Sequence, residues 1–158
     1  MVKEYQKIYE EQVIDLILPI QQLEYEIPIT IENQPDLKKI ETFYQKGKGN
    51  FWVALCDNKV VGTIGLLDIG DQMVALRKMF VHQNFRGLQY KTAANLLHQA
   101  INWAKDLSLA AIYLGTTPQF LAAHRFYEKN GFIPVMEIDL PTNFPVMQVD
   151  KLFYKYNL

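Results

Sequence analysis

The sequence predicts a mixed α/β (α+β) fold in which helices cover both faces of one sheet, and two observations support that prediction. First, three segments of strand character follow one another at 51–56, 60–67 and 73–81, with a short turn between the first two. Second, the hydrophobic period then changes, because from 90 to 107 the apolar residues recur at helical spacing, and a short apolar run follows at 110–114. A strand–helix–strand unit of this kind is parallel and right-handed and lays its helix on a face of the sheet.

Further elements are expected on both sides of this unit. An amphipathic helix is predicted over about 12–23, and Pro19 is expected to kink or divide it because proline lacks an amide donor. Thr117 and Pro118 form a typical helix start, so a late helix is predicted to run from there to Lys129. The remaining predicted elements are a first strand within 2–9, a helix from Pro35 that ends before Gly47, and closing strands at 132–140 and 147–156.

Length and composition indicate one globular domain over residues 1–158. Apolar residues make up 49% of the chain and the net charge is −1, which excludes a disordered chain and argues against nucleic acid as the main partner. The single cysteine, Cys56, is expected to be a buried strand residue, and the three histidines lack ligand spacing, so no metal site is expected. The polar N-terminus and the short apolar runs predict a cytoplasmic protein with no membrane partner.

The segment from Met79 to Lys91 has the pattern of an anion site. A strand ends at Val81, a short loop with Arg86 and Gly87 follows, and a long helix begins. The first turn of a helix carries unpaired amide groups and the positive end of the helix dipole, so it attracts a pyrophosphate. Arg86 adds a positive charge, and Gly87 permits a positive φ or a close approach of a ligand to the backbone.

This segment resembles the GCN5-related N-acetyltransferases (the GNAT superfamily), in which a strand ends in valine, four residues follow, and Arg/Gln-x-x-Gly-x-Gly/Ala opens a helix. Val81, the four residues after it and Arg86–Gly87 match that pattern. Gln89 and Lys91 depart from it, since the family has glycine at the first position and glycine or alanine at the second. Both are expected to be early helix positions that need no special backbone conformation.

A second motif agrees with the first. The segment 120–132 is similar to the family's helix Asn-x-x-Ala-x-x-Leu-Tyr-Glu-Lys-x-Gly-Phe, with matches that include Ala123, Tyr127 and Gly131. Phe120 stands in place of the asparagine, so the hydrogen bond of that side chain toward the pantetheine arm is expected to be missing. The resemblance implies a twisted, largely antiparallel sheet of about six to seven strands. It also implies that acetyl-CoA contacts Met79, Phe80, Val81, Arg86, Gly87, Leu88, Gln89, Tyr90, Lys91, Phe120 and Ala123.

The activity that the resemblance implies is N-acetyl transfer from acetyl-CoA to a primary amine within a ternary complex. Tyr127 matches the family's general acid, and a phenol, with a reference pKa of about 10, suits protonation of a leaving thiolate. A backbone amide at Phe80 or a neighbour is expected to polarise the thioester carbonyl. The expected acceptor is a small metabolite, an amino acid or a peptide terminus, and a homodimer is compatible with the sequence. The alternative is a regulatory module that binds acetyl-CoA without catalysis.

The general base is not assigned by the sequence. Ala75 stands where many relatives have a glutamate on the strand before the coenzyme loop. The segment 20–26 lies where the family places its acceptor-binding loop, and its acidic character favours a cationic amine. The acidic candidates on the expected acceptor side are Glu24, Glu26, Asp68 and Asp71.

Overall fold

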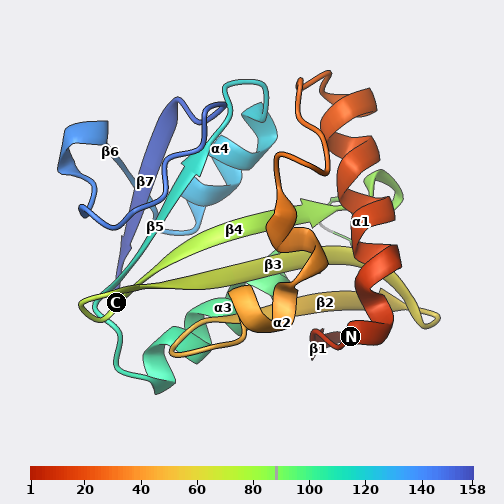
Figure 1. Cartoon of the computed structure of the whole chain (residues 1–158), viewed down its shortest axis with the longest axis horizontal. Helices are drawn as coiled ribbons and strands as arrows, with labels where there is room; N and C mark the ends of the chain where they lie inside the picture. The colour runs from red at the N-terminus through yellow and green to blue at the C-terminus, as the bar shows by residue number, and fades with distance from the viewer. Residues whose placement is uncertain (88) are drawn as a thin grey trace.

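The computed structural model describes residues 1–87 and 89–158, and its strands form one seven-stranded sheet in the order β1-β2-β3-β4-β5-β7-β6 (Figure 1). The strands are β1 (Val2–Glu4), β2 (Asn50–Cys56), β3 (Lys59–Gly70), β4 (Met73–Val81), β5 (Ala111–Thr116), β6 (Ile133–Val135) and β7 (Leu152–Asn157). The α-helices are α1 (Glu10–Pro19), α2 (Ile40–Phe43), α3 (Thr92–Asp106) and α4 (Leu121–Lys129). Short 3-10 turns occupy Lys7–Tyr9, Pro35–Lys38, Gln83–Phe85 and Glu137–Asp139.

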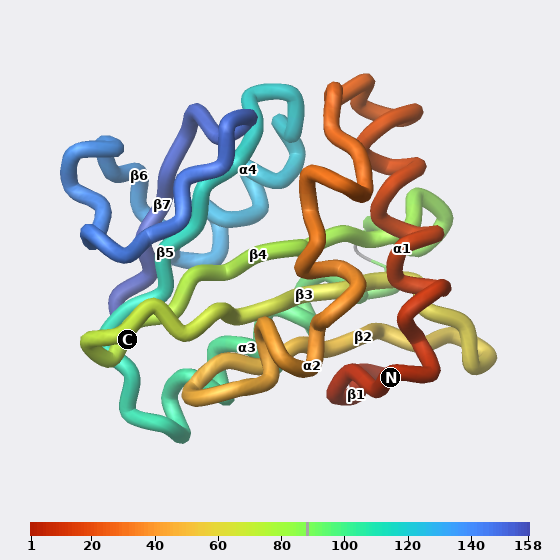
Figure 2. The backbone as a smooth tube through the Cα atoms, in the orientation of Figure 1, coloured from red at the N-terminus to blue at the C-terminus, as the bar shows by residue number. Residues whose placement is uncertain are grey.

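The sheet is mixed and largely antiparallel. The first four strands form an antiparallel meander, and β5, β7 and β6 form a second antiparallel group. The parallel pairing of β4 with β5 joins the two groups, and α3 connects these strands along the chain. Figures 1 and 2 show β5 and β7 rising steeply across the direction of β2 and β3, as expected of a twisted sheet. The predicted fold class is confirmed, including the parallel strand–helix–strand unit.

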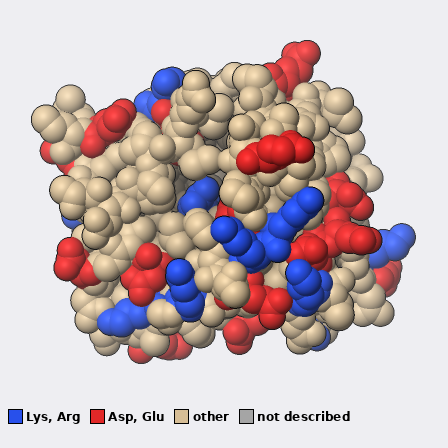
Figure 3. All heavy atoms as spheres, viewed as in Figure 1, with Lys and Arg blue, Asp and Glu red and all other residues tan. Residues whose placement is uncertain are grey.

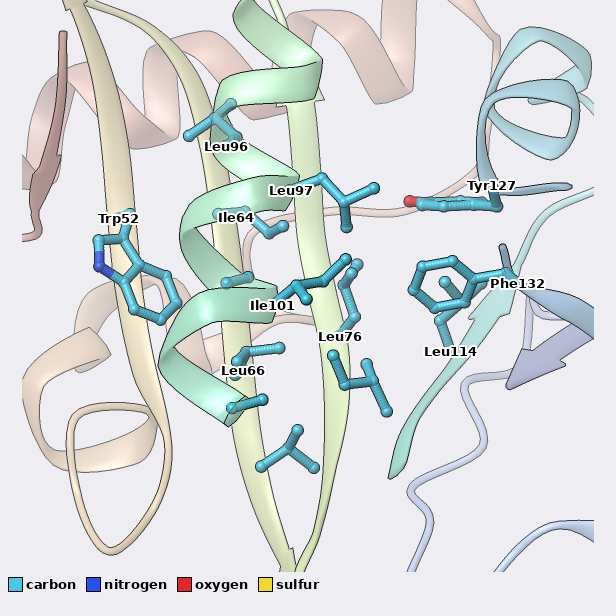
Figure 4. Packing of buried hydrophobic residues seen from close by; sticks show 14 of the residues in the cluster. Trp52, Ile64, Leu66, Leu76, Leu96, Leu97, Ile101, Leu114, Tyr127 and Phe132 are labelled. Carbon is cyan, nitrogen blue, oxygen red and sulfur yellow. The ribbon is translucent and has the colours of Figure 1, made fainter. Parts of the chain in front are cut away.

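Helices lie on both faces of the sheet because its central strands are apolar on both sides. In β2, Trp52 and Ala54 belong to the core cluster that includes α3, while Phe51 and Val53 belong to the cluster that includes α1. This alternation follows from the two-residue period of a strand. Figure 4 shows the α3 face, where helix side chains such as Leu97 lie against the strands, and α4 contributes to the same cluster.

Two helix boundaries reflect local backbone constraints. Pro19 ends α1 as expected, and the chain continues as one π-helical turn, Ile20–Glu24. In contrast, α3 begins at Thr92 rather than at Tyr90, because the preceding Lys91 adopts a left-handed conformation. The helix predicted from Pro35 divides into a 3-10 turn and the short α2.

Three predictions in other parts of the chain were wrong. The helix predicted to start at Thr117 begins at Leu121, because Thr117 lies in the turn that follows β5. The closing strands are shorter than predicted, since only Ile133–Val135 of 132–140 forms a strand, a 3-10 turn follows it, and β7 starts after a loop. Cys56 is exposed, because it is the last residue of β2 at the turn into β3.

A β-bulge in β4 turns two basic side chains toward the α2 face. The pairing of β4 with β3 shifts register between the pairs Thr63–Phe80 and Gly65–Arg77, and Lys78 within this interval has φ of 56°. A bulge adds an unpaired residue, so alternation of side chains fails there. As a result Arg77 lies over an α2 ring and Lys78 lies beside the turn before α2.

Candidate active site

A cleft of about 780 Å³ opens where β4 and β5 separate. The two strands pair from Met73–Ala111 to Ala75–Tyr113, and within the described residues the ladder between them ends there. Figure 4 shows the strands diverging from each other. Residues 76–81 of β4 and 114–117 of β5 and its turn therefore become walls of the cleft, together with the beginnings of α3 and α4.

The edge of β4 that faces the cleft presents backbone hydrogen-bonding groups. Met79, Phe80 and Val81 line the cleft, while β4 stays paired with β3 along its opposite edge. An open strand edge of this kind binds an extended ligand much as it would bind another strand. These three residues are the ones that the sequence assigned to the arm of the coenzyme.

Two left-handed residues shape the loop between β4 and α3. Gly87 has φ of 102°, and Lys91 has φ of 54° immediately before α3. Lys91 thus needs a special backbone conformation, contrary to the sequence expectation, at a position where glycine meets less steric hindrance. Gly87 and Lys91 line the cleft, whereas Gln89 and Tyr90 are exposed and lie outside its described wall. Leu88, also assigned to the coenzyme, lies outside the described residues.

Arg86 ties this loop to the segment that follows α1. Its Nη2 donates to Glu24 Oε1 at 2.9 Å, its Nη1 donates to the other carboxylate oxygen, and its Nε donates to the Val81 carbonyl at 2.8 Å. This pairing lowers the pKa of Glu24 and raises that of Arg86. Since Arg86 also lines the cleft, an anion bound there would compete with Glu24 for the guanidinium.

Tyr127 points its hydroxyl from α4 toward Leu97 of α3, across the space where the two strands separate (Figure 4). The residue lines the cleft, yet it is only 5% exposed, because its ring packs among Phe126, Phe132 and Tyr154. Burial raises the pKa of Tyr127 well above the ordinary value. The phenol is therefore protonated at neutral pH and is a weaker acid than an exposed tyrosine.

Phe120 and Ala123 complete the wall next to Tyr127. Phe120 packs edge-on against Tyr25 at 4.7 Å and against Phe80 at 6.1 Å between ring centroids. Where the family pattern has an asparagine, this chain therefore makes an aromatic contact that links β4 to the segment after α1.

The acidic residues considered as general bases are either engaged in hydrogen bonds or outside the described wall of the cleft. Glu24 is paired with Arg86, and Asp68 accepts hydrogen bonds from two backbone amides, which lower its pKa. Glu26 and Asp71 are exposed and lie outside the described wall of the cleft. Ala75 is buried in an apolar cluster with residues of β5 and β7.

Three charged residues of the cleft were missed by the sequence analysis, namely Arg77, Lys78 and Asp150. Lys78 Nζ donates to Gln34 Oε1 at 2.6 Å and lies 3.8 Å from an Asp36 carboxylate oxygen, and burial lowers the pKa of Lys78 to about 8. Burial also raises the pKa of Asp150. For Arg77 and Lys78, the sequence feature that could have been noticed is that two adjacent basic residues interrupt the otherwise apolar run 73–81.

Metal and membrane features were also sought over residues 1–87 and 89–158. No three His, Cys, Asp or Glu side chains gather there in a way that would hold a metal ion. No helix in the same ranges has both the length and the apolar character needed to cross a bilayer.

Comparison with solved structures gives near-complete matches. An acetyltransferase of the GNAT family from Staphylococcus aureus Mu50 is 41% identical, covers 99% of this chain and 98% of its own, and superposes with a TM-score of 0.96. An acetyltransferase from Streptococcus agalactiae 2603 is 32% identical, covers 100% of this chain and 98% of its own, and gives a TM-score of 0.95.

Comparison of sequences points to the same group of proteins. N-acetylaspartate synthetase of Xenopus tropicalis is 34% identical over 124 residues, which are 76% of this chain and 45% of that protein, so this chain spans less than half the length of that relative. Residues 14–132 match the Acetyltransferase (GNAT) family, a range that contains both the loop between β4 and α3 and the helix that carries Tyr127. The chain is therefore a member of the GNAT family of acetyltransferases.

Proposed function

We propose that this protein transfers the acetyl group of acetyl-CoA to a primary amine while both substrates are bound. One observation carries the proposal: the open edge of β4 and the buried hydroxyl of Tyr127 face the same cleft. A thioester laid along Met79, Phe80 and Val81 would run beside the residue that can protonate its sulfur. Holding both reactants in this way supplies a large part of an enzyme's rate enhancement.

The loop before α3 would hold the pyrophosphate of the coenzyme. The amides of the first turn of α3 have no helical partners and lie at the positive end of the helix dipole. Apart from its neighbours along the chain, a Cβ placed on Gly87 would meet no atom of the described residues within 4 Å, so the space beside it is open to a ligand. Arg86, which is paired with Glu24 in the free protein, would direct some of its N–H donors to the phosphates instead.

The chemistry assigned to the cleft is direct acyl transfer. The amine nitrogen attacks the thioester carbon, the C–N bond forms, and the C–S bond breaks. Tyr127 gives its proton to the leaving thiolate, and the proton lost by the nitrogen returns to Tyr127 through solvent water. The amide of Phe80 or a neighbour would stabilise the charge that develops on the carbonyl oxygen.

The acceptor would enter from the side formed by the segment after α1 and the residues before β7, both of which line the cleft. A small metabolite, an amino acid or a peptide terminus suits this opening. The name of the Xenopus relative specifies an amino acid, aspartate, as the acetylated compound of that protein.

A screen of amines with acetyl-CoA, followed by release of the free thiol, tests the proposal. We expect saturable thiol release that needs both substrates, with the acetyl group recovered on the amine by mass spectrometry. Binding of acetyl-CoA, seen as a higher melting temperature, without thiol release for any amine would instead identify a regulatory module. No change in melting temperature at millimolar acetyl-CoA would contradict the coenzyme assignment itself.

A further inference from the structure

Arg77 is a half-buried cation in the cleft wall with most of its hydrogen-bonding capacity unused by the described residues. Its guanidinium carbon lies 5.7 Å from the ring centroid of Phe43 and 5.9 Å from that of Tyr44. The side-chain hydrogen bond recorded for it runs from Nη2 to the sulfur of Met147 at 3.5 Å, and a thioether is a weak acceptor. Among residues 1–87 and 89–158, no carboxylate lies within 4.0 Å of it.

The rings beside Arg77 prepare it for a planar anion. A guanidinium presents its N–H donors in a fixed fork that matches the two oxygens of a carboxylate. Contact with aromatic faces limits the orientations of the group, so less freedom is lost when a ligand binds. Figure 3 shows basic side-chain atoms inside a recess over β4, between β5 and the segment that links α1 to α2.

The neighbouring charged side chains leave the Arg77 guanidinium open to a ligand. Lys78 is matched by Asp36 at 3.8 Å and is hydrogen-bonded to Gln34. Asp150 belongs to the same wall, but its Oδ2 accepts from the Met147 amide at 3.4 Å rather than from Arg77. Arg77 and Asp150 are close enough for their charges to interact, but among residues 1–87 and 89–158 they form no ion pair within 4.0 Å. An anion could therefore bind the Arg77 guanidinium directly, and Asp150 would face a positive group elsewhere on the same ligand.

The phosphates of the coenzyme are poorly placed to be that anion. The loop that would hold them follows Val81, which is four residues and roughly 13 Å further along the strand. Val81 and Met79 pack on the α3 face, whereas Arg77 lies against α2 on the opposite face of the sheet. The second substrate, which in the proposed function enters between the segment after α1 and the residues before β7, is therefore the ligand that would reach Arg77.

We infer that the acceptor is an amine that also carries a carboxylate, as amino acids do, and that Arg77 binds this carboxylate so that the amine points toward the thioester. The inference rests on the proposed acetyl transfer. It assigns Arg77 a role in specificity and gives the acceptor two anchor points, the carboxylate at one end and the reacting nitrogen at the other.

Matched acceptors test this assignment, and we name three sets. They are alanine with alaninamide and ethylamine, aspartate with asparagine and its α-amide, and phenylalanine with phenylalaninamide and phenethylamine. Rates of thiol release are compared per fraction of free amine, because amides and amino acids differ in the basicity of their amines. The proteins are the wild type, Arg77→Gln, Arg77→Lys and the control Arg125→Gln, which changes an exposed arginine on α4 outside the cleft wall.

In at least one set we expect the wild type to prefer the carboxylate over its neutral analogue by roughly 10- to 100-fold in kcat/KM, the range of a charge-assisted hydrogen bond. Arg77→Gln should lose that preference mainly by raising KM for the carboxylate, Arg77→Lys should keep part of it, and Arg125→Gln should keep it all. Unchanged melting temperature and acetyl-CoA affinity show that a variant is folded.

Two results would overturn the inference while leaving acetyl transfer intact. One is a wild type that acetylates neutral analogues as well as carboxylates in all three sets. The other is a preference that survives unchanged in both Arg77 variants. Absence of thiol release with every amine would contradict the proposed function first, and this inference with it.

Discussion

At the scale of the residue, two buried tyrosines of the same core cluster differ in where their hydroxyl groups point. Burial raises the pKa of both Tyr127 and Tyr154, so both are protonated at neutral pH. The Tyr154 hydroxyl donates a hydrogen bond to Glu128 at 2.6 Å, away from the cleft. The Tyr127 hydroxyl points into the space between the diverging strands. Of the two, Tyr127 is the one placed to protonate a leaving group.

Replacing Tyr127 with phenylalanine removes this hydroxyl and keeps the packed ring. We expect kcat to fall by about 100-fold, which is about 2.7 kcal/mol of activation free energy, because general acid catalysis is typically worth 10²- to 10⁴-fold. Acetyl-CoA affinity should change little, since the acid acts on charge that develops in the transition state. The matched control is Tyr154→Phe, which should retain kcat. A Tyr127→Phe enzyme with wild-type kcat under chemistry-limited conditions would make Tyr127 a packing residue.

Lys78 should give the stability of the protein a characteristic pH dependence. Its pKa is about 8 in the folded protein and 10.5 in the reference state, so between these pH values the unfolded chain binds more protons at this site. The free energy of unfolding should therefore rise with pH in that window. From pH 7.5 to 9.5 we expect the wild type to gain about 1–2 kcal/mol relative to Lys78→Met, measured by urea unfolding. Parallel pH profiles of the two proteins would contradict the depressed pKa.

Residue patterns in the sequence pointed to Tyr127, which lines the cleft, but not to Arg77, Lys78 or Asp150, which line it as well. The tyrosine belongs to a motif that lies on one helix, where spacing alone fixes which side chains share a face. The basic pair is oriented by a bulge, and the position of a bulge depends on how β4 pairs with β3. Asp150 reaches the cleft through a loop whose path local sequence does not specify.

At the scale of the element, two glycines offer a matched test of the phosphate loop. Gly87 and Gly131 have φ of 102° and 96°, but Gly87 lines the cleft and Gly131 follows α4 outside it. Alanine at either position should cost about 1–3 kcal/mol of folding stability through backbone strain. We expect Gly87→Ala also to weaken acetyl-CoA binding by about 10-fold or more in calorimetry, whereas Gly131→Ala should not. Equal affinities in the two variants would place the phosphates elsewhere.

Elements whose position depends on the hydrophobic period were predicted well. Elements whose ends depend on the backbone conformation of single residues were predicted poorly. The central strands match because long apolar runs have to be buried on both faces of the sheet. The start of α3 was misjudged because nothing in the identity of Lys91 announces a left-handed conformation. The start of α4 was misjudged because Thr117 and Pro118 suit a tight turn as well as a helix cap.

At the scale of the whole molecule, the order of elements and the helix layers could be predicted, whereas the cleft could not. Core periodicity places helices on both faces, and both core clusters agree with that arrangement. The separation of β4 from β5 is different, because both strands are largely apolar apart from Arg77 and Lys78 of β4 and would suit continuous pairing. The separation depends on where the chain leaves each strand, which is a property of the assembled sheet.

The short junction between β4 and β5 leaves a seam in the sheet that an extended coenzyme would close. Backbone amides along 79–81 that face this seam should exchange with deuterated solvent faster than those bonded to β3 in the free protein. On addition of acetyl-CoA we expect their exchange to slow, while amides at the already paired Met73–Ala75 stay as they were. The coenzyme would then pair with β4 as an additional strand. The sheet would be more regular in the complex than in the free protein.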